Sequence, residues 1–284
     1  MAITGSGTQQ DPWIVHDISE IQSCIGQSGK YLKLANDINC NNYGTSFVWS
    51  TLSSNADFDL DGHAIKNIEI GSSARFSSGN SGLIHNGKIL NVYLNGSDCF
   101  SSNSRFEEIS FSIDASAQDI VYNSNTAVFY GTSTRIDKCA IYAKNTKKAL
   151  IHDGTGNNIE VSETDILIDS DVDTTGTMGN GNWETYIGAK LSKCRIRGHM
   201  NKYTGTALTS NNVDNCVMDL EIETAVIRNT VSGGTVTSSA INSEVLNIDP
   251  QVFTSGYIKC STSEIKNGAD LRSKGFLVVN VVSG

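Results

Sequence analysis

The sequence predicts an all-β fold: a single right-handed parallel β-helix, or solenoid, with a short capping helix before it and a capping segment after it. Three observations support this prediction. A short apolar phrase recurs along most of the 284 residues, as it does in repeat architectures. Charged residues make up only 18% of the chain, and 26 glycines suit many short strands joined by turns. Each predicted strand is too short to bury its apolar face alone, so stacking on neighbours must supply the core.

The recurring phrase is an apolar residue, two free positions, a small or apolar residue, and then further apolar residues at alternating positions. From Ile65 to Val236, its first residues are 24, 17, 30, 25, 30, 22 and 23 positions apart. Irregular intervals of that size are typical of solenoid coils. The copies span residues 65–70, 89–94, 106–113, 136–141, 161–168, 191–196, 213–220 and 236–241.

Residues 1–40 lie outside the repeat and are predicted to form an N-terminal cap of one helix and one strand. Asp17–Ile25 has apolar residues at helical spacing, with Asp17 or Ser19 as the residue that caps the helix. Residues 30–38 alternate between apolar and polar as a strand does. A helix packed over the first coil would cover an edge that otherwise invites pairing with another chain.

The coils are predicted to occupy residues 41–262, and residues 263–284 to form the C-terminal cap. The last apolar run, Phe276–Val282, lacks alternation, so both of its faces should be covered. It is either the far cap of the solenoid or a contact with another subunit. One repeat that runs across most of the chain favours a single domain over two.

Three of the seven cysteines stand at the same place in the repeated phrase. We interpret them as rungs of an internal ladder, buried and reduced. A zinc site is the alternative, but no histidine or second cysteine stands at the usual ligand spacing. The three cysteines are Cys139, Cys194 and Cys216, and the residues predicted to fill the same place in the other copies are Ile68, Val92, Ile109, Thr164 and Ser239.

Several segments carry the resemblance to a known group of proteins: Pro12–Val15 with the predicted helix after it, Tyr31–Ile38, Phe58–Ile68, Ser81–Val92 and Ser263–Phe276. The third contains the turn Asp-Gly-His followed by Ile-x-Asn-Ile. These segments resemble bacterial and phage β-helical proteins with GLUG-type repeats. The resemblance implies a parallel β-helix and, for the phage members, a homotrimer.

Asp57, Asp59 and Asp61 alternate along a predicted strand, so their carboxylates would point to one side. Two carboxylates close together can act as acid and base on a glycosidic bond. The resemblance instead places them in a repeated structural phrase, where such carboxylates brace turns and backbone donors. The sequence therefore assigns no catalytic residue.

Asp169, Asp171 and Asp173 place oxygen ligands at alternate positions, as calcium-binding loops do. The glycine of this motif comes two residues late, and Asn180 stands where the loop needs a glutamate. The alternative is an acidic loop in contact with solvent. Calcium is the one cofactor that the sequence suggests.

Trp183 and Tyr186 are the candidate binding residues for a glycan or a protein receptor. They follow the glycine-rich stretch 176–182, which is predicted to leave the solenoid between two coils. Their aromatic rings either contact a sugar ring or pack back onto the core.

The formal net charge is −9 and no basic run is visible, which argues against nucleic acid and an anionic membrane surface as partners. The longest apolar run is far shorter than the roughly 20 residues of a membrane helix. The first residues contain neither a basic segment nor an apolar stretch, so we expect no secretory signal. We therefore expect a protein made in a cytoplasm, without membrane insertion.

These features lead to three functional hypotheses. The first is a non-enzymatic phage virion protein, a tail, baseplate or head-fibre component whose β-helix serves as a rigid spacer or a receptor-facing surface. Its partners would be other virion proteins, a host-surface glycan or protein receptor and further copies of itself, and it would assemble in the host bacterial cytoplasm. The second is a fragment of a bacterial surface adhesin. The third is a polysaccharide-degrading enzyme on the same fold.

Overall fold

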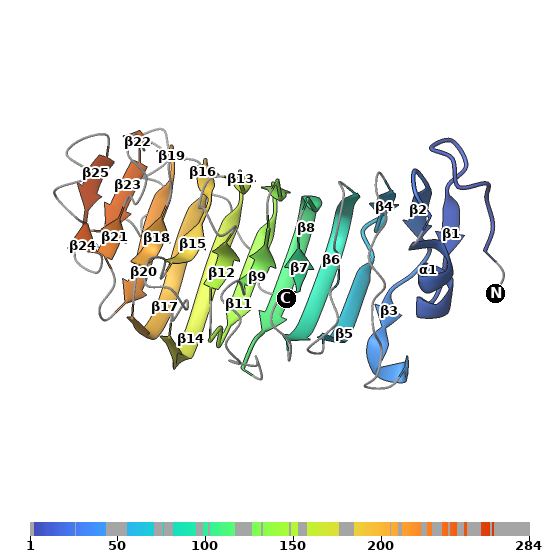
Figure 1. Ribbon diagram of the computed structural model, residues 1–284, viewed down its shortest axis with the longest axis horizontal. Coiled ribbons are helices and arrows are strands. Elements are labelled where there is room, and N and C mark those ends of the chain that lie inside the picture. Colours follow the sequence, from blue (N-terminus) through green and yellow to red (C-terminus); the bar gives the residue numbers. More distant parts are fainter. Residues whose placement is uncertain are drawn as a thin grey trace.

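A computed structural model gives the fold of the chain (Figure 1). The structure describes residues 3–25, 27–43, 56–70, 76, 82–94, 99–101, 103–116, 127–131, 133–147, 149–152, 158–175, 185–204, 206–209, 212–222, 226–228, 235–237, 239–242, 247–248, 257–261 and 263. Within these residues, no helix is both long enough and apolar enough to cross a membrane.

The described residues form two β-sheets, one α-helix and one short 3-10 helix. The helices are α1 Ile18–Ile25 and η1 Cys40–Tyr43. The larger sheet contains β1 Trp13–Val15, β2 Tyr31–Leu34, β3 Ile38–Asn39, β4 Asp57–Asp59, β5 Ala64–Ile70, β6 Leu83–Leu94, β8 Arg105–Asp114, β10 Arg135–Asp137, β11 Ala140–Lys144, β13 Glu160–Ser162, β14 Asp165–Thr175, β16 Lys190–Ser192, β17 Arg195–Thr204, β19 Asn212–Asp214, β20 Val217–Ile222, β22 Thr235–Thr237, β23 Ser239–Asn242 and β25 Tyr257–Cys260. The smaller sheet contains β7 Phe100–Ser101, β9 Ala127–Tyr130, β12 Ala149–His152, β15 Thr185–Gly188, β18 Thr206–Thr209, β21 Val226–Arg228 and β24 Asn247–Ile248.

All pairings between these strands are parallel, and each strand pairs with its equivalent in an adjacent coil, most of them on both sides. The strands therefore lie in rows along the long axis of the molecule, from β1 at the blue end to β25 at the red end (Figure 1). From β10 onward a coil contributes three strands, one to each of three rows, as β10, β11 and β12 do. The prediction of an all-β parallel solenoid is confirmed.

The inward side chains form apolar columns that cross the coils. Ile136 pairs with Val161, which pairs with Leu191, and all three are buried. In the neighbouring row, Ile166 lies between Ile141 and Ile196, and none of the three is exposed. Because each column buries a face that no single coil can bury, the core belongs to the stack.

Each described copy of the repeated phrase contains a corner where the backbone adopts a positive φ. The residue at the third position of the phrase has φ between 48° and 60°, which an L-residue adopts mainly at tight turns. The small or apolar residue after the corner then turns back into the core. These corner residues are Asn67, Asn91, Glu108, Lys138, Glu163, Lys193 and Asn215.

The first two copies of the phrase use a different corner from the later ones. Ile65 pairs with Ile89 as expected, but Ile89 pairs with Phe111 and not with Phe106. The prediction that Ile68 and Val92 share the cysteine position is therefore wrong. The error arises because apolar residues around any positive-φ corner give the same sequence phrase.

The predicted ladder of buried cysteines is correct for the later coils. Cys139, Cys194 and Cys216 are buried and free. The Cys139 N–H donates to Thr164 Oγ1 at 3.2 Å, Cys194 N–H to Cys216 Sγ at 3.4 Å, and Cys216 N–H to Ser239 Oγ at 3.1 Å. At these three corners the backbone N–H faces the next coil, where a small side chain supplies its buried acceptor. Burial raises the pKa of the Cys139 thiol to about 12, so it stays protonated.

The N-terminal segment contains the predicted helix, α1. Asp17 caps it, since Asp17 Oδ1 accepts from the Glu20 N–H at 3.0 Å. Ile18 and Ile21 on its inner face belong to the hydrophobic core. The parallel rows begin before residue 41, because β1 pairs with β2 and β2 with β4. Apart from residue 263, the predicted C-terminal cap lies outside the described residues.

Candidate functional site

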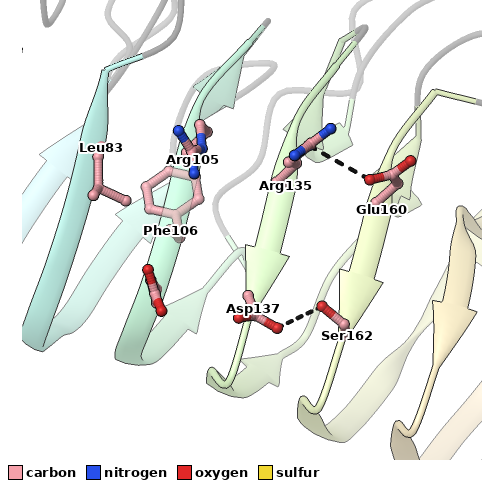
Figure 2. Close-up of a pocket in the computed structure, with 8 residues that line it drawn as sticks. Leu83, Arg105, Phe106, Arg135, Asp137, Glu160 and Ser162 are labelled. Carbon is pink, nitrogen blue, oxygen red and sulfur yellow. Dashed lines mark hydrogen bonds and ion pairs between the residues drawn. The ribbon is translucent and has the colours of Figure 1, made fainter. Parts of the chain in front are cut away.

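A surface groove of about 240 Å³ crosses four successive strands on one face of the solenoid, β6, β8, β10 and β13. The outward positions of these strands form two rows of side chains, because equivalent residues of adjacent coils lie in register. Figure 2 shows these rows, with Leu83, Arg105, Arg135 and Glu160 in the upper one. The complete lining is Leu83, Arg105, Phe106, Glu107, Arg135, Asp137, Glu160 and Ser162.

Ion pairs and hydrogen bonds between coils hold most of the charged groups of the groove. Arg135 Nε lies 3.4 Å from Glu160 Oε2, and Glu160 Oε1 lies 3.7 Å from Lys190 Nζ. In the lower row, Ser162 Oγ donates to Asp137 Oδ1 at 2.5 Å. Lys138 Nζ reaches Glu107 Oε1 at 3.2 Å from the corner beside the groove. These exposed pairs contribute little stability each, but they fix the orientation of the side chains.

Arg105 differs from the other charged residues of the groove. Its side chain is exposed, and in the described part of the chain no ion pair or hydrogen bond joins its guanidinium group to another residue. Leu83, which is half-buried, precedes it in the same row, and Arg135 follows it (Figure 2). The groove therefore combines one unengaged cation, an apolar contact beside it and carboxylate oxygens one row away.

This arrangement is suited to binding a polar ligand. A guanidinium group offers five N–H donors in a planar fork, and carboxylates offer only acceptors. Glu107 and Asp137 are half-buried and open to the groove. The lining holds two guanidinium groups against three carboxylates. A ligand must therefore present both hydrogen-bond donors and acceptors.

Tyr186, one of the two predicted binding residues, does not line the groove. Tyr186, on β15, is fully buried, and its hydroxyl group hydrogen-bonds with that of Thr146. The prediction that it meets a ligand is wrong, since an aromatic ring next to an expected excursion proved to be part of the core. Burial raises the pKa of Tyr186, so the hydroxyl stays protonated. Trp183 lies outside the described residues.

The acidic segment with Asp169, Asp171 and Asp173 is not a loop. It belongs to β14, whose register with β17 shifts between Ser170 and Asp173. Asp169 Oδ2 accepts a hydrogen bond from the Tyr142 hydroxyl at 2.9 Å. Among the described residues, no group of three or more His, Cys, Asp or Glu could hold a metal ion. The calcium-loop interpretation is therefore wrong in its geometry, because alternation along the chain also occurs in a strand.

The three aspartates of residues 57–61 hold turns and neighbouring coils, as the structural interpretation expected. Asp57 Oδ1 lies 2.8 Å from His85 Nε2. Asp59 Oδ1 accepts from the Asp61 N–H at 2.8 Å and from Asn86 Nδ2 at 3.0 Å. Asp61 Oδ1 lies 3.0 Å from Lys33 Nζ. Each carboxylate thus has its own partner.

Reasoning from the sequence missed the groove residues. Arg105 and Arg135 stand immediately before the first apolar residue of two successive phrases, and Glu107 and Asp137 immediately after it. Aligning the copies by these flanking positions would have placed like residues in rows. The signal is weak, because most outward positions of a solenoid are polar whether or not they bind a ligand.

No protein-family model matches the chain, and no significant relative was found among curated proteins. One solved structure, described as a candidate immunoglobulin A1 protease from Bacteroides ovatus, is similar in fold with a TM-score of 0.49 and 14% sequence identity. The alignment covers 95% of this chain and 89% of that chain.

Proposed function

We propose that this chain is a non-enzymatic structural protein of a phage particle, a tail, baseplate or head-fibre component, in which the solenoid serves as a rigid spacer with a receptor-facing side. The observation that carries this proposal is the continuous stacking of the coils. Parallel rows run from β1 to β25, and inward columns such as Ile141–Ile166–Ile196 are fully buried. Such a stack resists bending because every coil packs on both neighbours.

The finer features of the proposal follow from the repeat and from the resemblance to GLUG-type proteins. The solenoid is right-handed, α1 closes its N-terminal end, and residues 263–284 close the far end or contact another subunit. The chain forms a homotrimer, and it assembles with other virion proteins in the cytoplasm of a bacterial host. Its receptor is a glycan or a protein of the host surface.

Immunogold electron microscopy tests the proposal. Antibodies against the chain should label phage particles released by the host and leave uninfected cells unlabelled. Labelling of uninfected cell surfaces and not of particles would favour the surface adhesin. Release of sugars from purified surface polysaccharide, abolished by Asp59→Asn or Asp171→Asn, would favour the polysaccharide-degrading enzyme.

The mass of the protein in solution tests the oligomeric state separately. Sedimentation equilibrium of the purified chain should give three times the mass of 30.5 kDa. A single chain mass at all concentrations would contradict the homotrimer but leave the particle location to the labelling experiment.

A further inference from the structure

We propose that the groove lined by Arg105, Glu107, Arg135 and Asp137 binds an acidic polysaccharide, whose carboxylate pairs with Arg105. This inference deepens the proposed function, because it rests on the receptor-facing role and names the class of receptor. It begins with Arg105, whose exposed guanidinium group is unengaged within the described part of the chain. Arg135, one coil further, already contacts Glu160 at 3.4 Å. An incoming acid group therefore meets Arg105 first.

The balance of charges in the groove selects against a simple anion. Two guanidinium groups face three carboxylates, and the whole chain carries a formal charge of −9. Phosphate or nucleic acid would be attracted by the Arg105 guanidinium group but repelled by the negative charges of Glu107 and Asp137. Each unit of an acidic sugar chain carries one acid group and several hydroxyl groups, so the acid can pair with Arg105 while the hydroxyls donate hydrogen bonds to the same carboxylates.

The shape of the site favours a sugar chain over a single sugar. The two rows run along the solenoid. Within each row, the side chains of adjacent coils are spaced about 4.8 Å apart. Leu83, before Arg105 in the upper row, offers an apolar contact for the C–H face of a sugar ring. Beyond it, Arg105, Arg135 and Glu160 succeed one another along the upper row (Figure 2). An extended polysaccharide along these rows contacts several coils at once.

Isothermal titration calorimetry on the full chain tests the inference with oligosaccharides of galacturonate, mannuronate, hyaluronan and α2,8-linked sialate, each also in its methyl-esterified form. At least one free acid should bind, and its ester at least about tenfold more weakly, since a hydrogen-bonded charge pair is lost. Arg105→Gln should weaken binding of the free acid by about tenfold or more. Lys88→Gln removes a charge from an exposed position on β6 outside the groove, and it should change affinity less than about twofold.

Four results would overturn the inference: none of the acids binds, an ester binds as well as its acid, Arg105→Gln binds as well as the native chain, or inorganic phosphate competes as well as the oligosaccharides. Thermal melting of both variants verifies that they fold. The test is separate from that of the proposed function. Labelled particles without glycan binding reject the groove alone, whereas glycan binding without labelled particles rejects the phage assignment alone.

Discussion

The pair of His85 and Asp57 shows how one residue can join two coils. His85 on β6 lies beside Asp59 in the register and reaches Asp57 Oδ1 with its Nε2 at 2.8 Å. The hydrogen bond with Asp57 raises the pKa of His85, and the charges of Asp59 and Glu107 add to this effect, while burial opposes it. The imidazole therefore holds its proton more tightly in the folded chain than in the unfolded one.

We predict that this pair makes stability depend on pH. Because the folded pKa of His85 is raised, its contribution is fully present below the unfolded pKa of about 6.5, provided that Asp57 is ionised. It is lost as the pH rises through the folded pKa. The difference in free energy of unfolding between the native chain and His85→Gln, measured by urea denaturation, should be largest near about pH 5.5.

The same series in an Asp57→Asn background provides the control for the His85 prediction. There the effect of His85→Gln should vary much less with pH, since the strongest partner of the imidazole is absent. A difference that stays constant, or that grows as the pH rises, would contradict the assignment of the stabilising charge to His85.

Among the elements, the corner between the first and second strand of each later coil depends on a side-chain acceptor. At Lys138 the positive φ turns the chain, and the Cys139 N–H that follows meets Thr164 Oγ1 of the next coil. The Thr164 hydroxyl donates in turn to the Ser162 carbonyl at 2.7 Å. A small polar side chain thus accepts a hydrogen bond from a buried backbone N–H that has no partner in the strand pairing.

Replacing Thr164 with valine should destabilise the fold by about 1–3 kcal/mol, because the Cys139 N–H loses its acceptor while the shape of the side chain is kept. Thr164→Ser, which retains the hydroxyl and loses one methyl group, is the matched variant and should be the more stable of the two. Chemical denaturation of both proteins measures the difference. Equal stability, or a more stable valine variant, would mean that this acceptor is unimportant.

The sequence predicted which segments form strands better than it predicted the register in which strands of successive coils pair. Alternating apolar residues identified the strands of the rows, since inward side chains must be apolar at every second position. The register of Ile89 with Phe111 could not be predicted, because it depends on the length of each coil, which the repeated phrase does not contain. The later copies were aligned correctly, since Ile136, Val161 and Leu191 share one column.

The candidate site was less predictable than the fold. Tyr186 was chosen for its aromatic ring, but only the three-dimensional packing places it in the core. Arg105 and Glu107 become neighbours of Arg135 and Asp137 through the stacking of β8 on β10, across about thirty residues of sequence. Such rows exist only once the register is known, so a groove on a solenoid follows from the structure.

At the scale of the whole molecule, the free energy of unfolding depends on contacts between adjacent coils along the solenoid axis. Each coil packs only on its neighbours, so a defect in a central coil separates the coils before it from those after it. Aromatic packing reinforces the middle of the stack: Phe100 and Phe129, in adjacent coils of the smaller sheet, stack with their ring centroids 4.7 Å apart. The central coils are therefore the sensitive part of the molecule.

A charge placed in a central column should therefore prevent folding of the whole chain. Ile166 is fully buried between Ile141 and Ile196, so Ile166→Asp would lose apolar packing and bury an unpaired carboxylate, at a cost comparable to the total stability of about 5–15 kcal/mol. Leu167→Asp places the same charge at the adjacent, half-buried position and should still melt cooperatively. Thermal unfolding followed by circular dichroism distinguishes the two. A cooperative transition of Ile166→Asp near the native temperature would show that the columns do not carry the stability of the solenoid.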